Sequence, residues 1–309
     1  MTALAEVPLR GAGREPVDLW RTLVSHGFAA LPPLVLDEQA RTLELTLALD
    51  DGRARTVLVR AGKRGHAALS VAGRKPSAAT TEQLVAAVAH VLRLDEDLSA
   101  FYDLVDGDPD LGWAAAGAGR MLRSPTVFED VVKTICTTNC AWSATERMVG
   151  ALVEHLGAAD DATGRHAFPA AEAMAGADET FYREVVRAGY RGAYLRSLAA
   201  SVADGDVELE GLAASASPDL SDEVVAERLL ALPGVGPYAA AHVMMLLGRY
   251  SRLILDSWTR PKYARLTNAR KPPTDRTIER RFRRYRGYAG LAFWLYLTRD
   301  WVGEEPGTA

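Results

Sequence analysis

A single carboxylate, Asp256, ends the apolar run 253–255 and precedes a helix that the pattern predicts to begin near Trp258. A carboxylate at the mouth of a buried segment, facing a cleft, can stabilise the oxocarbenium-like charge that develops on a sugar when a glycosidic bond breaks. It can also orient the attacking water. An isolated aspartate before a helix is most often an N-cap. The two interpretations are compatible, because a capping residue can also be catalytic.

The segment Leu232-Pro-Gly-Val-Gly-Pro-Tyr238 lies between two amphipathic stretches upstream of Asp256. Its glycines, Gly234 and Gly236, permit a tight reversal in which backbone amides face an anion. A helix that starts at Pro237 adds the positive end of its dipole, so the segment predicts a phosphate-binding site. An ordinary corner between two helices is the alternative.

The charge of the chain is unevenly distributed. The formal net charge is −4, although residues 259–286 carry eleven lysines and arginines against two acids and therefore a charge of +9. This asymmetry is expected when one face meets a polyanion, since neutralised phosphates supply most non-specific affinity for nucleic acid. A solvated, arginine-rich helix surface explains the charge equally well, so the stretch alone does not decide the partner.

Composition predicts a globular protein of two domains, because 309 residues with 48% hydrophobic content can bury one large core or two modest ones. No stretch has the length and apolarity of a membrane span, and we expect a cytoplasmic protein. Cys136 and Cys140 are the only cysteines, too few for an iron–sulfur cluster held by four thiolates. We therefore expect no cofactor to be required for the chemistry.

Hydrophobic periodicity changes near residue 80. Alternating patterns at 43–49, 55–60 and 67–71 predict an antiparallel β-meander, and from Thr80 onward the period is helical. The predicted fold class is α+β, with an N-terminal antiparallel β-sheet subdomain over 15–79 and a mainly α-helical domain over 80–303. The segments at 157–164 and 203–217 are interpreted as surface loops.

Four segments together resemble the helix-hairpin-helix DNA glycosylase superfamily, which includes 3-methyladenine and 8-oxoguanine DNA glycosylases. They are the hairpin 232–238 with Asp256 following 18 residues after Tyr238, the segment 124–139 that opens the helical domain, the Gly-Tyr-Arg element 189–194, and the last core helix 288–296. The resemblance spans residues 30–301. It implies an enzyme that extrudes a damaged base from duplex DNA and cuts it from its sugar.

Carried onto this sequence, the resemblance makes Asp256 the catalytic aspartate. Asn139 falls where the family fills the gap left by the extruded base, Tyr190 would wedge beside it, and Arg191 would face the opposite strand. For Asn139 a helix-capping amide is the alternative, and Tyr190 is equally consistent with a core aromatic.

The same carry-over assigns the hairpin. Gly234, Val235, Gly236 and Tyr238 are expected to contact DNA. The carbonyl groups of Leu230, Leu232 and Val235 match those that hold a monovalent cation, Na⁺ or K⁺, against a DNA phosphate.

Two positions depart from the family's patterns. Tyr238 stands where bifunctional members carry the lysine that forms a Schiff base with the sugar, so strong lyase activity is not expected. Phe293 stands where 8-oxoguanine enzymes carry a glutamine that reads the base. The aromatic residues nearby suit stacking on an electron-poor alkylated base, although such a cluster is also typical of a core; they are Trp142, Phe293, Trp294 and Tyr296.

The sequence thus predicts a monofunctional DNA glycosylase that favours an alkylated purine and acts as a monomer on double-stranded DNA in base excision repair. Two alternatives stay open. One is an 8-oxoguanine-type glycosylase with an altered base pocket, and the other is a DNA-structure-binding protein that has kept the fold without the chemistry.

Overall fold

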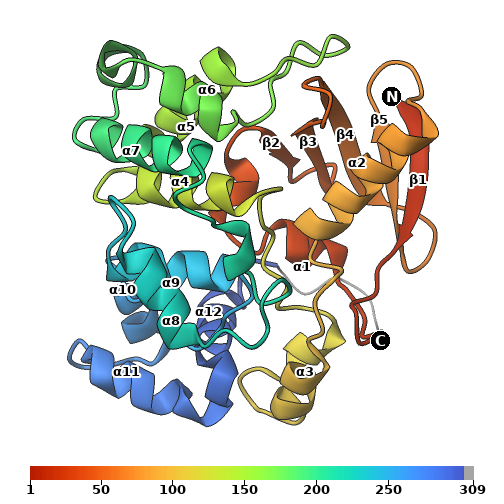
Figure 1. The fold of residues 1–309 in the computed structure, drawn as a ribbon. Coiled ribbons are helices and arrows are strands. Elements are labelled where there is room, and N and C mark those ends of the chain that lie inside the picture. The colour runs from red at the N-terminus through yellow and green to blue at the C-terminus, as the bar shows by residue number, and fades with distance from the viewer. Residues whose placement is uncertain (303–309) are drawn as a thin grey trace.

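The N-terminal part of the chain forms a five-stranded antiparallel sheet in the computed structural model, which describes residues 1–302. The strand order is β1-β5-β4-β3-β2 (Figure 1). The strands are β1 (Thr2–Pro8), β2 (Leu34–Asp37), β3 (Thr42–Ala48), β4 (Ala54–Ala61) and β5 (His66–Val71). The predicted antiparallel meander over β3, β4 and β5 is confirmed.

Strand β1 lies outside the predicted subdomain of residues 15–79 and extends the sheet at its far edge. Only Val7 of this strand is buried, so its sequence lacks the alternation that marked the other strands. Its partner β5 pairs Thr2 with Val71, a contact between residues far apart in the chain. The sheet unit therefore begins earlier than predicted. Gly303, where the predicted helical domain ends, lies outside the described residues.

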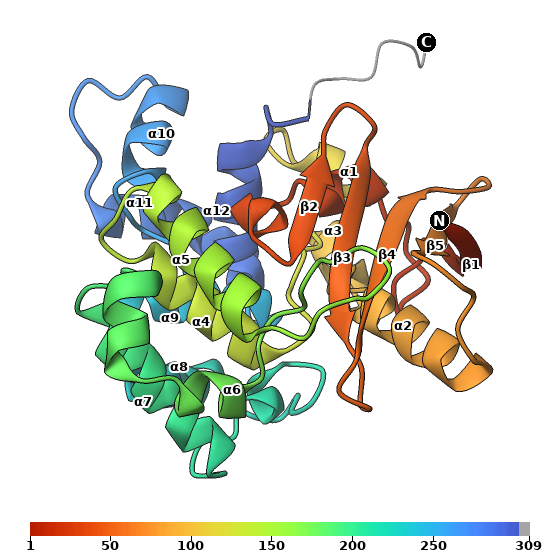
Figure 2. The same cartoon turned by 90° about the horizontal axis from the view of Figure 1, so that it is seen from above.

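Helix α2 (Ala78–Val91) covers one face of the sheet. Its start is fixed by Ser77, whose hydroxyl accepts a hydrogen bond from the Thr80 amide. Leu84 and Val88 are fully buried and join a core formed with Val57 and Leu69 of the sheet. Seen from above, α2 and the sheet form one side of the molecule and the helical part forms the other (Figure 2).

The remainder of the described chain is helical and has two further cores. Their elements are α1 (Leu19–Leu23), η1 (Gly27–Ala30), α3 (Ser99–Val105), η2 (Gly112–Ala116), α4 (Val127–Thr137), α5 (Trp142–Leu156), α6 (Ala171–Gly176), η3 (Phe181–Val185), α7 (Arg191–Ala203), η4 (Glu210–Leu212), α8 (Asp222–Leu230), α9 (Pro237–Leu246), α10 (Thr259–Leu266), α11 (Asp275–Phe282), η5 (Arg283–Tyr288) and α12 (Ala289–Thr298). Within residues 1–302 no helix combines the length and apolarity needed to cross a bilayer.

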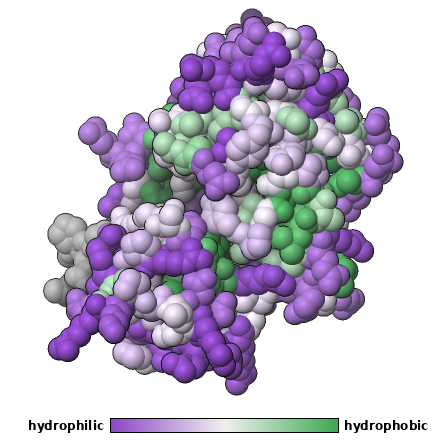
Figure 3. Space-filling model, turned by 90° about the vertical axis from the view of Figure 1, so that its left-hand side faces the viewer, coloured by the Kyte–Doolittle hydropathy of each residue, from purple (hydrophilic) through white to green (hydrophobic). Residues whose placement is uncertain are grey.

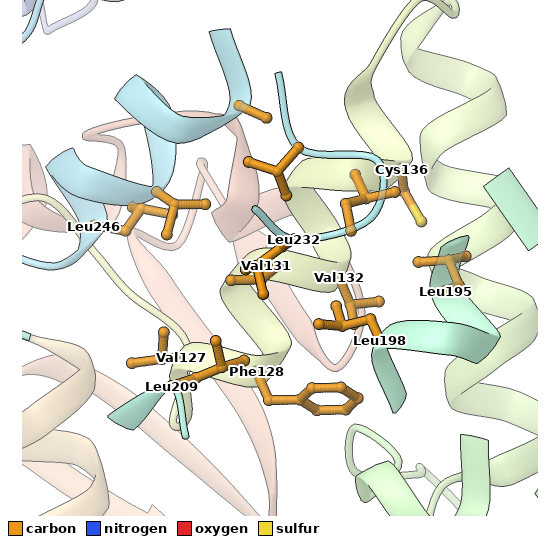
Figure 4. Close-up of a cluster of buried hydrophobic side chains, with 14 of the residues drawn as sticks. Val127, Phe128, Val131, Val132, Cys136, Leu195, Leu198, Leu209, Leu232 and Leu246 are labelled. Atoms are coloured by element: carbon orange, nitrogen blue, oxygen red, sulfur yellow. The ribbon is translucent and has the colours of Figure 1, made fainter. Parts of the chain in front are cut away.

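Helix α9 separates the two helical cores and contributes to both. One core is aliphatic and is built on α4 and α7, with side chains such as Val131, Val132 and Leu198 interlocked beneath the hairpin (Figure 4). The other, built on α12, is rich in aromatic rings. Met244 of α9 packs into the first core and Met245 into the second. The N-terminus of α9, where the predicted anion site lies, is thereby held from both sides.

Candidate functional site

The hairpin between α8 and α9 has the tight reversal expected from its two glycines. Gly234 has a φ of +81°, in the left-handed region that favours glycine. A Cβ added there would lie 2.9 Å from Cδ2 of Tyr194, so a side chain would also collide with a neighbour. The fold itself therefore requires glycine at this position.

Gly236 has a different reason to lack a side chain. Its φ of −98° is open to any residue, and a Cβ added there would meet nothing within 4 Å. It is the N-cap of α9, whose first amides have no partners inside the helix. The absent side chain leaves these amides uncovered, as close approach of an anion requires.

Beside the hairpin lies an open cleft of about 900 Å³. Its walls come from the α4–α5 loop, the hairpin and the segment after α9, and they include Asn139, Cys140, Tyr190, Gly236, Tyr238 and Asp256. The side of the molecule that faces left in Figure 1 is hollowed, with hydrophobic patches bordered by hydrophilic side chains (Figure 3). The structure thus brings together most of the predicted site residues.

The Asp256 side chain is held in the turn that precedes α10, whose N-cap is Trp258. Its Oδ1 accepts hydrogen bonds from the amides of Trp258 at 2.8 Å and Thr259 at 2.7 Å, and the Thr259 hydroxyl accepts the Asp256 amide in return at 2.8 Å. Among residues 1–302, none donates a hydrogen bond to Oδ2. One carboxylate oxygen therefore fixes the side chain, and the other is available where the residue lines the cleft.

A second cavity of about 490 Å³ adjoins the cleft and shares Asp256 and Tyr238 with it. Three tryptophan rings pack against one another along its wall: Trp258 lies 5.6 Å from Trp294 and 5.9 Å from Trp301, between ring centroids. Phe28 and Trp142 also line it. We call this space the aromatic cavity.

Of the four aromatic residues predicted near the base, only two line the aromatic cavity. Trp142 and Trp294 do so, whereas Phe293 and Tyr296 are buried in the α12 core. Phe293 is 0% exposed and packs 5.1 Å from the ring of Phe282. The prediction for Phe293 is therefore wrong. Neighbouring residues of a helix point about 100° apart, so residue 294 faces the cavity while residue 293 faces the core.

Asn139 and Tyr190 lie together at the rim of the cleft. Asn139 has a φ of +46° in the loop between α4 and α5, and its Nδ2 donates to the Tyr190 hydroxyl at 3.2 Å. This hydrogen bond lowers the pKa of Tyr190. Neither alternative interpretation holds, because Ala141 is the N-cap of α5 and Tyr190 is 54% exposed.

Arg191 does not face outward as predicted. It is 7% exposed, its Nε donates to the Thr138 carbonyl at 3.0 Å, and its Nη2 donates to the same oxygen. Its guanidinium also lies 4.6 Å from the centroid of the Tyr190 ring. The structure therefore corrects the prediction, since Arg191 braces the loop that carries Asn139 and the ring beside it.

Tyr238 occupies the junction between cleft and cavity. Its hydroxyl lies 3.2 Å from the Thr137 hydroxyl, and burial raises its pKa. Within residues 1–302, no lysine lines either the cleft or the aromatic cavity.

Two histidines of the aromatic cavity were not predicted. His26 donates from Nε2 to the Leu122 carbonyl and accepts the Phe28 amide at Nδ1, while His242 lines the cavity from α9. Burial lowers the pKa of His26 to about 3 and that of His242 to about 4. His242 follows Tyr238 by four residues, a helical spacing that could have revealed it, but nothing local in the sequence connects His26 to the site.

Four of the eleven basic residues in the stretch 259–286 form ion pairs within the protein. Ion pairs join Arg260 to Asp275 at 2.7 Å, Lys262 to Asp300 at 2.6 Å, Arg281 to Asp110 at 3.0 Å and Arg284 to Asp108 at 3.2 Å. The stretch is therefore less cationic toward a ligand than its composition indicates.

A groove of about 560 Å³ next to the hairpin collects other arginines. Arg252, Arg283 and Arg286 line it, are exposed and have no ion pair among the described residues. The groove shares Pro237 and Tyr238 with the open cleft. We call it the arginine groove.

The hairpin carbonyls predicted to hold a monovalent cation fit that role in part. Among residues 1–302, no amide donates to the carbonyl oxygens of Leu230 or Val235, while the Leu232 oxygen accepts the Val235 amide at 3.2 Å. Carbonyl oxygens left without donors at a turn are suitable ligands for a hard cation.

No protein-family model matches the sequence, and no curated protein sequence matches it significantly. Solved structures do. A 3-methyladenine DNA-glycosylase from Archaeoglobus fulgidus superposes with a TM-score of 0.71 at 20% identity, covering 97% of this chain and 100% of that one. MBOgg1 in complex with a low affinity DNA ligand gives 0.69 at 20% identity, covering 92% and 93%.

An 8-oxoguanine glycosylase/lyase from Clostridium acetobutylicum, in complex with double-stranded DNA, gives a TM-score of 0.60 at 19% identity and covers 82% of this chain and 87% of that one. Sequence identities this low support only a similarity in the arrangement of helices and strands. Because the superpositions extend over most of both chains, this chain has the α+β fold of these DNA glycosylase structures.

Proposed function

We propose that this chain is a monofunctional DNA glycosylase that extrudes a damaged purine, with an alkylated base favoured, and hydrolyses its N-glycosidic bond. The position of Asp256 carries the proposal. Its Oδ1 is fixed by two amides, and the residue lies where the open cleft meets the aromatic cavity. A sugar held in the cleft and a base held in the cavity would place the bond between them at this carboxylate.

Duplex DNA would bind across the hairpin. The uncovered amides at the start of α9 suit a backbone phosphate, and the missing side chain of Gly236 lets the phosphate approach. A monovalent cation on the carbonyls of Leu230, Leu232 and Val235 would add positive charge beside the same phosphate. The arginine groove continues this surface.

Extrusion of a base leaves a gap in the stack that must be filled. Asn139 and Tyr190 are suited to that role, because they project at the rim and are held in position by their mutual hydrogen bond and by Arg191. An amide can pair with the orphaned base, and an exposed ring can wedge between steps.

In the chemical step, the bond from the sugar C1′ to the base nitrogen breaks and the base leaves with the bonding electrons. The negative charge of Asp256 stabilises the positive charge that grows on the sugar ring. A water molecule adds its oxygen to C1′ and gives up one proton, with Asp256 placed to accept it. A cationic alkylated purine leaves as a neutral molecule and needs little acid assistance.

Two observations support the finer assignments. Tyr238 at the junction carries a phenol, which cannot form a Schiff base with the sugar. This supports hydrolysis by water without a covalent amine intermediate, as expected of a monofunctional enzyme. The rings of Trp258, Trp294 and Trp301 favour a cationic or electron-poor base, since π-faces attract positive charge.

The test is incubation of the purified protein with duplexes that carry alkylated purines, 8-oxoguanine, hypoxanthine or uracil, followed by detection of the free base and of strand breaks. We expect release of an alkylated purine and strand breaks only after alkali. Release of 8-oxoguanine alone would favour the 8-oxoguanine-type enzyme. Tight binding without release of any base would overturn the enzymatic proposal in favour of a DNA-structure-binding protein.

A further inference from the structure

His242 is a buried polar side chain without a protein partner. It is 8% exposed and lines the aromatic cavity together with Asp256. Its Nδ1 is enclosed and unpaired, and among residues 1–302 none forms a hydrogen bond with either ring nitrogen. Buried polar groups are nearly always hydrogen-bonded, so the unpaired ring requires an explanation.

The neighbours of His242 cannot supply the missing hydrogen bond. Its ring packs at centroid distances of 5.0 Å from Phe28, 5.9 Å from Tyr238 and 6.0 Å from His26. Phe28 has no polar atom, and the Tyr238 hydroxyl is directed to Thr137. Both nitrogens of His26 are already engaged, with the Leu122 carbonyl and the Phe28 amide.

The state of the ring follows from its surroundings. Burial lowers the pKa of His242 to about 4, so at neutral pH the imidazole is uncharged and carries one N–H. A proton on the enclosed Nδ1 would be a buried N–H without an acceptor. Buried donors without an acceptor are rarer in proteins than buried acceptors without a donor. The proton therefore belongs on Nε2, at the other edge of the ring that lines the cavity.

We propose that Nε2–H of His242 donates a hydrogen bond to the extruded base and selects purines with a carbonyl oxygen at position 6, such as N-alkylated guanines and hypoxanthine. This inference rests on the proposed function. It adds a substrate class that aromatic stacking alone does not define, because stacking on tryptophan rings does not distinguish a carbonyl from an amino group.

A recessed donor explains the preference for a carbonyl oxygen. The ring is almost entirely buried, and an exocyclic oxygen projects beyond the purine ring and can reach it, whereas ring nitrogens lie flush with the edge of the base. With an amino group at the same position, two hydrogen-bond donors would face each other and no hydrogen bond could form. A site built around one hydrogen bond then disfavours the mismatched base by about tenfold to a hundredfold.

The experiment compares release of 7-methylguanine and 7-methyladenine from otherwise identical duplexes by wild type, His242→Phe and His242→Gln. Wild type should prefer methylguanine by about tenfold or more in kcat/KM. The phenylalanine variant keeps the ring packing and removes the donor, so its preference should fall close to one. The glutamine variant, whose amide can donate from near Nε2, should retain release of methylguanine relative to His242→Phe.

An independent readout is the ¹⁵N spectrum of His242 in the full chain at neutral pH, assigned by comparison with His242→Gln. A neutral ring protonated at Nε2 is expected. A proton on Nδ1, or equal base preference in wild type and His242→Phe, would overturn the role of His242 while leaving glycosylase activity in place. Wild type that releases neither base from any duplex would overturn the proposed function and this inference with it.

Discussion

The open cleft and the aromatic cavity adjoin at Asp256 and Tyr238 but are built in opposite ways. The cleft presents backbone amides of the hairpin, which six residues form between the end of α8 and the start of α9. The cavity presents side chains, and its walls come from η1, α5, α9 and α12 and from the segment after α9. Backbone amides serve any phosphate, whereas a shaped set of rings discriminates between bases.

Under the proposed function, this difference should make affinity for DNA and choice of base separable. A change confined to the cleft should alter binding of every duplex alike. A change confined to the cavity should alter which base is released and how fast. Asp256 belongs to both regions and should affect the chemistry alone.

The largest effect is expected for Asp256→Asn, which removes the charge and little volume. Base release should fall by about a hundredfold or more, because the developing positive charge on the sugar loses its counter-charge. Duplex affinity should be retained, as measured by fluorescence anisotropy beside single-turnover release. Full activity in this variant would remove the carboxylate from the mechanism.

Gly236→Leu tests the cleft. The side chain enters open space, so the fold should be retained, but it covers the amides at the start of α9. We expect duplex affinity to fall by about tenfold to a hundredfold, equally for damaged and undamaged DNA, because charge-assisted hydrogen bonds to phosphate can no longer form.

Gly234→Ala is the contrasting variant, because it adds a side chain at a φ of +81° against Tyr194. Its Tm should drop, whereas that of Gly236→Leu should stay near wild type. A Gly236→Leu protein that binds DNA normally would show that phosphate does not bind at the hairpin.

Trp142→Ala tests the cavity. The indole packs against Gly27 and is 42% exposed, so its removal opens one wall without disrupting a core. Base release at saturating DNA should fall by about tenfold, with affinity for undamaged duplex within about twofold of wild type. Trp113→Ala, which changes a tryptophan outside the cavity lining, serves as the control. Equal decreases in both variants would contradict a role of Trp142 in holding the base.

The smallest effect is expected in the arginine groove. Replacing Arg283 or Arg286 with glutamine should reduce the slope of log affinity against log salt by about one for each phosphate that the arginine neutralises. Arg276→Gln and Arg280→Gln remove the same charge from the same stretch outside the groove. If all four variants show the same slope, the groove makes no special interaction with DNA.

The part of the site that sequence could predict is the part with local causes. The hairpin and Asp256 follow from short segments whose glycines and helix ends act on neighbouring residues, whereas Asn139 was assigned only through the resemblance to a known family. Strand β1 was missed because its single buried residue gives no alternation. The assignment of Phe293 failed by one residue, which on a helix exchanges a cavity-facing position for a core-facing one.

The cavity lining could not be read from local patterns. His26 and Phe28 reach it from the N-terminal region, and Trp301 reaches it from beyond α12. Contacts across such separations depend on how whole elements pack, which no window of sequence contains. His242 is intermediate, because its helical spacing from Tyr238 was visible, but its lack of a hydrogen-bond partner was not.

The contribution of residues 26–28 to the aromatic cavity has a consequence for the modularity of this protein. The segment lies between β1 and β2 in the chain, so the aromatic cavity is completed by residues that the predicted boundary assigned to the sheet unit. A helical part fused to a different N-terminal sheet would keep its hairpin and Asp256, but its aromatic cavity would have a different shape. The residues of the sheet unit that line the aromatic cavity would thus take part in the proposed choice of base.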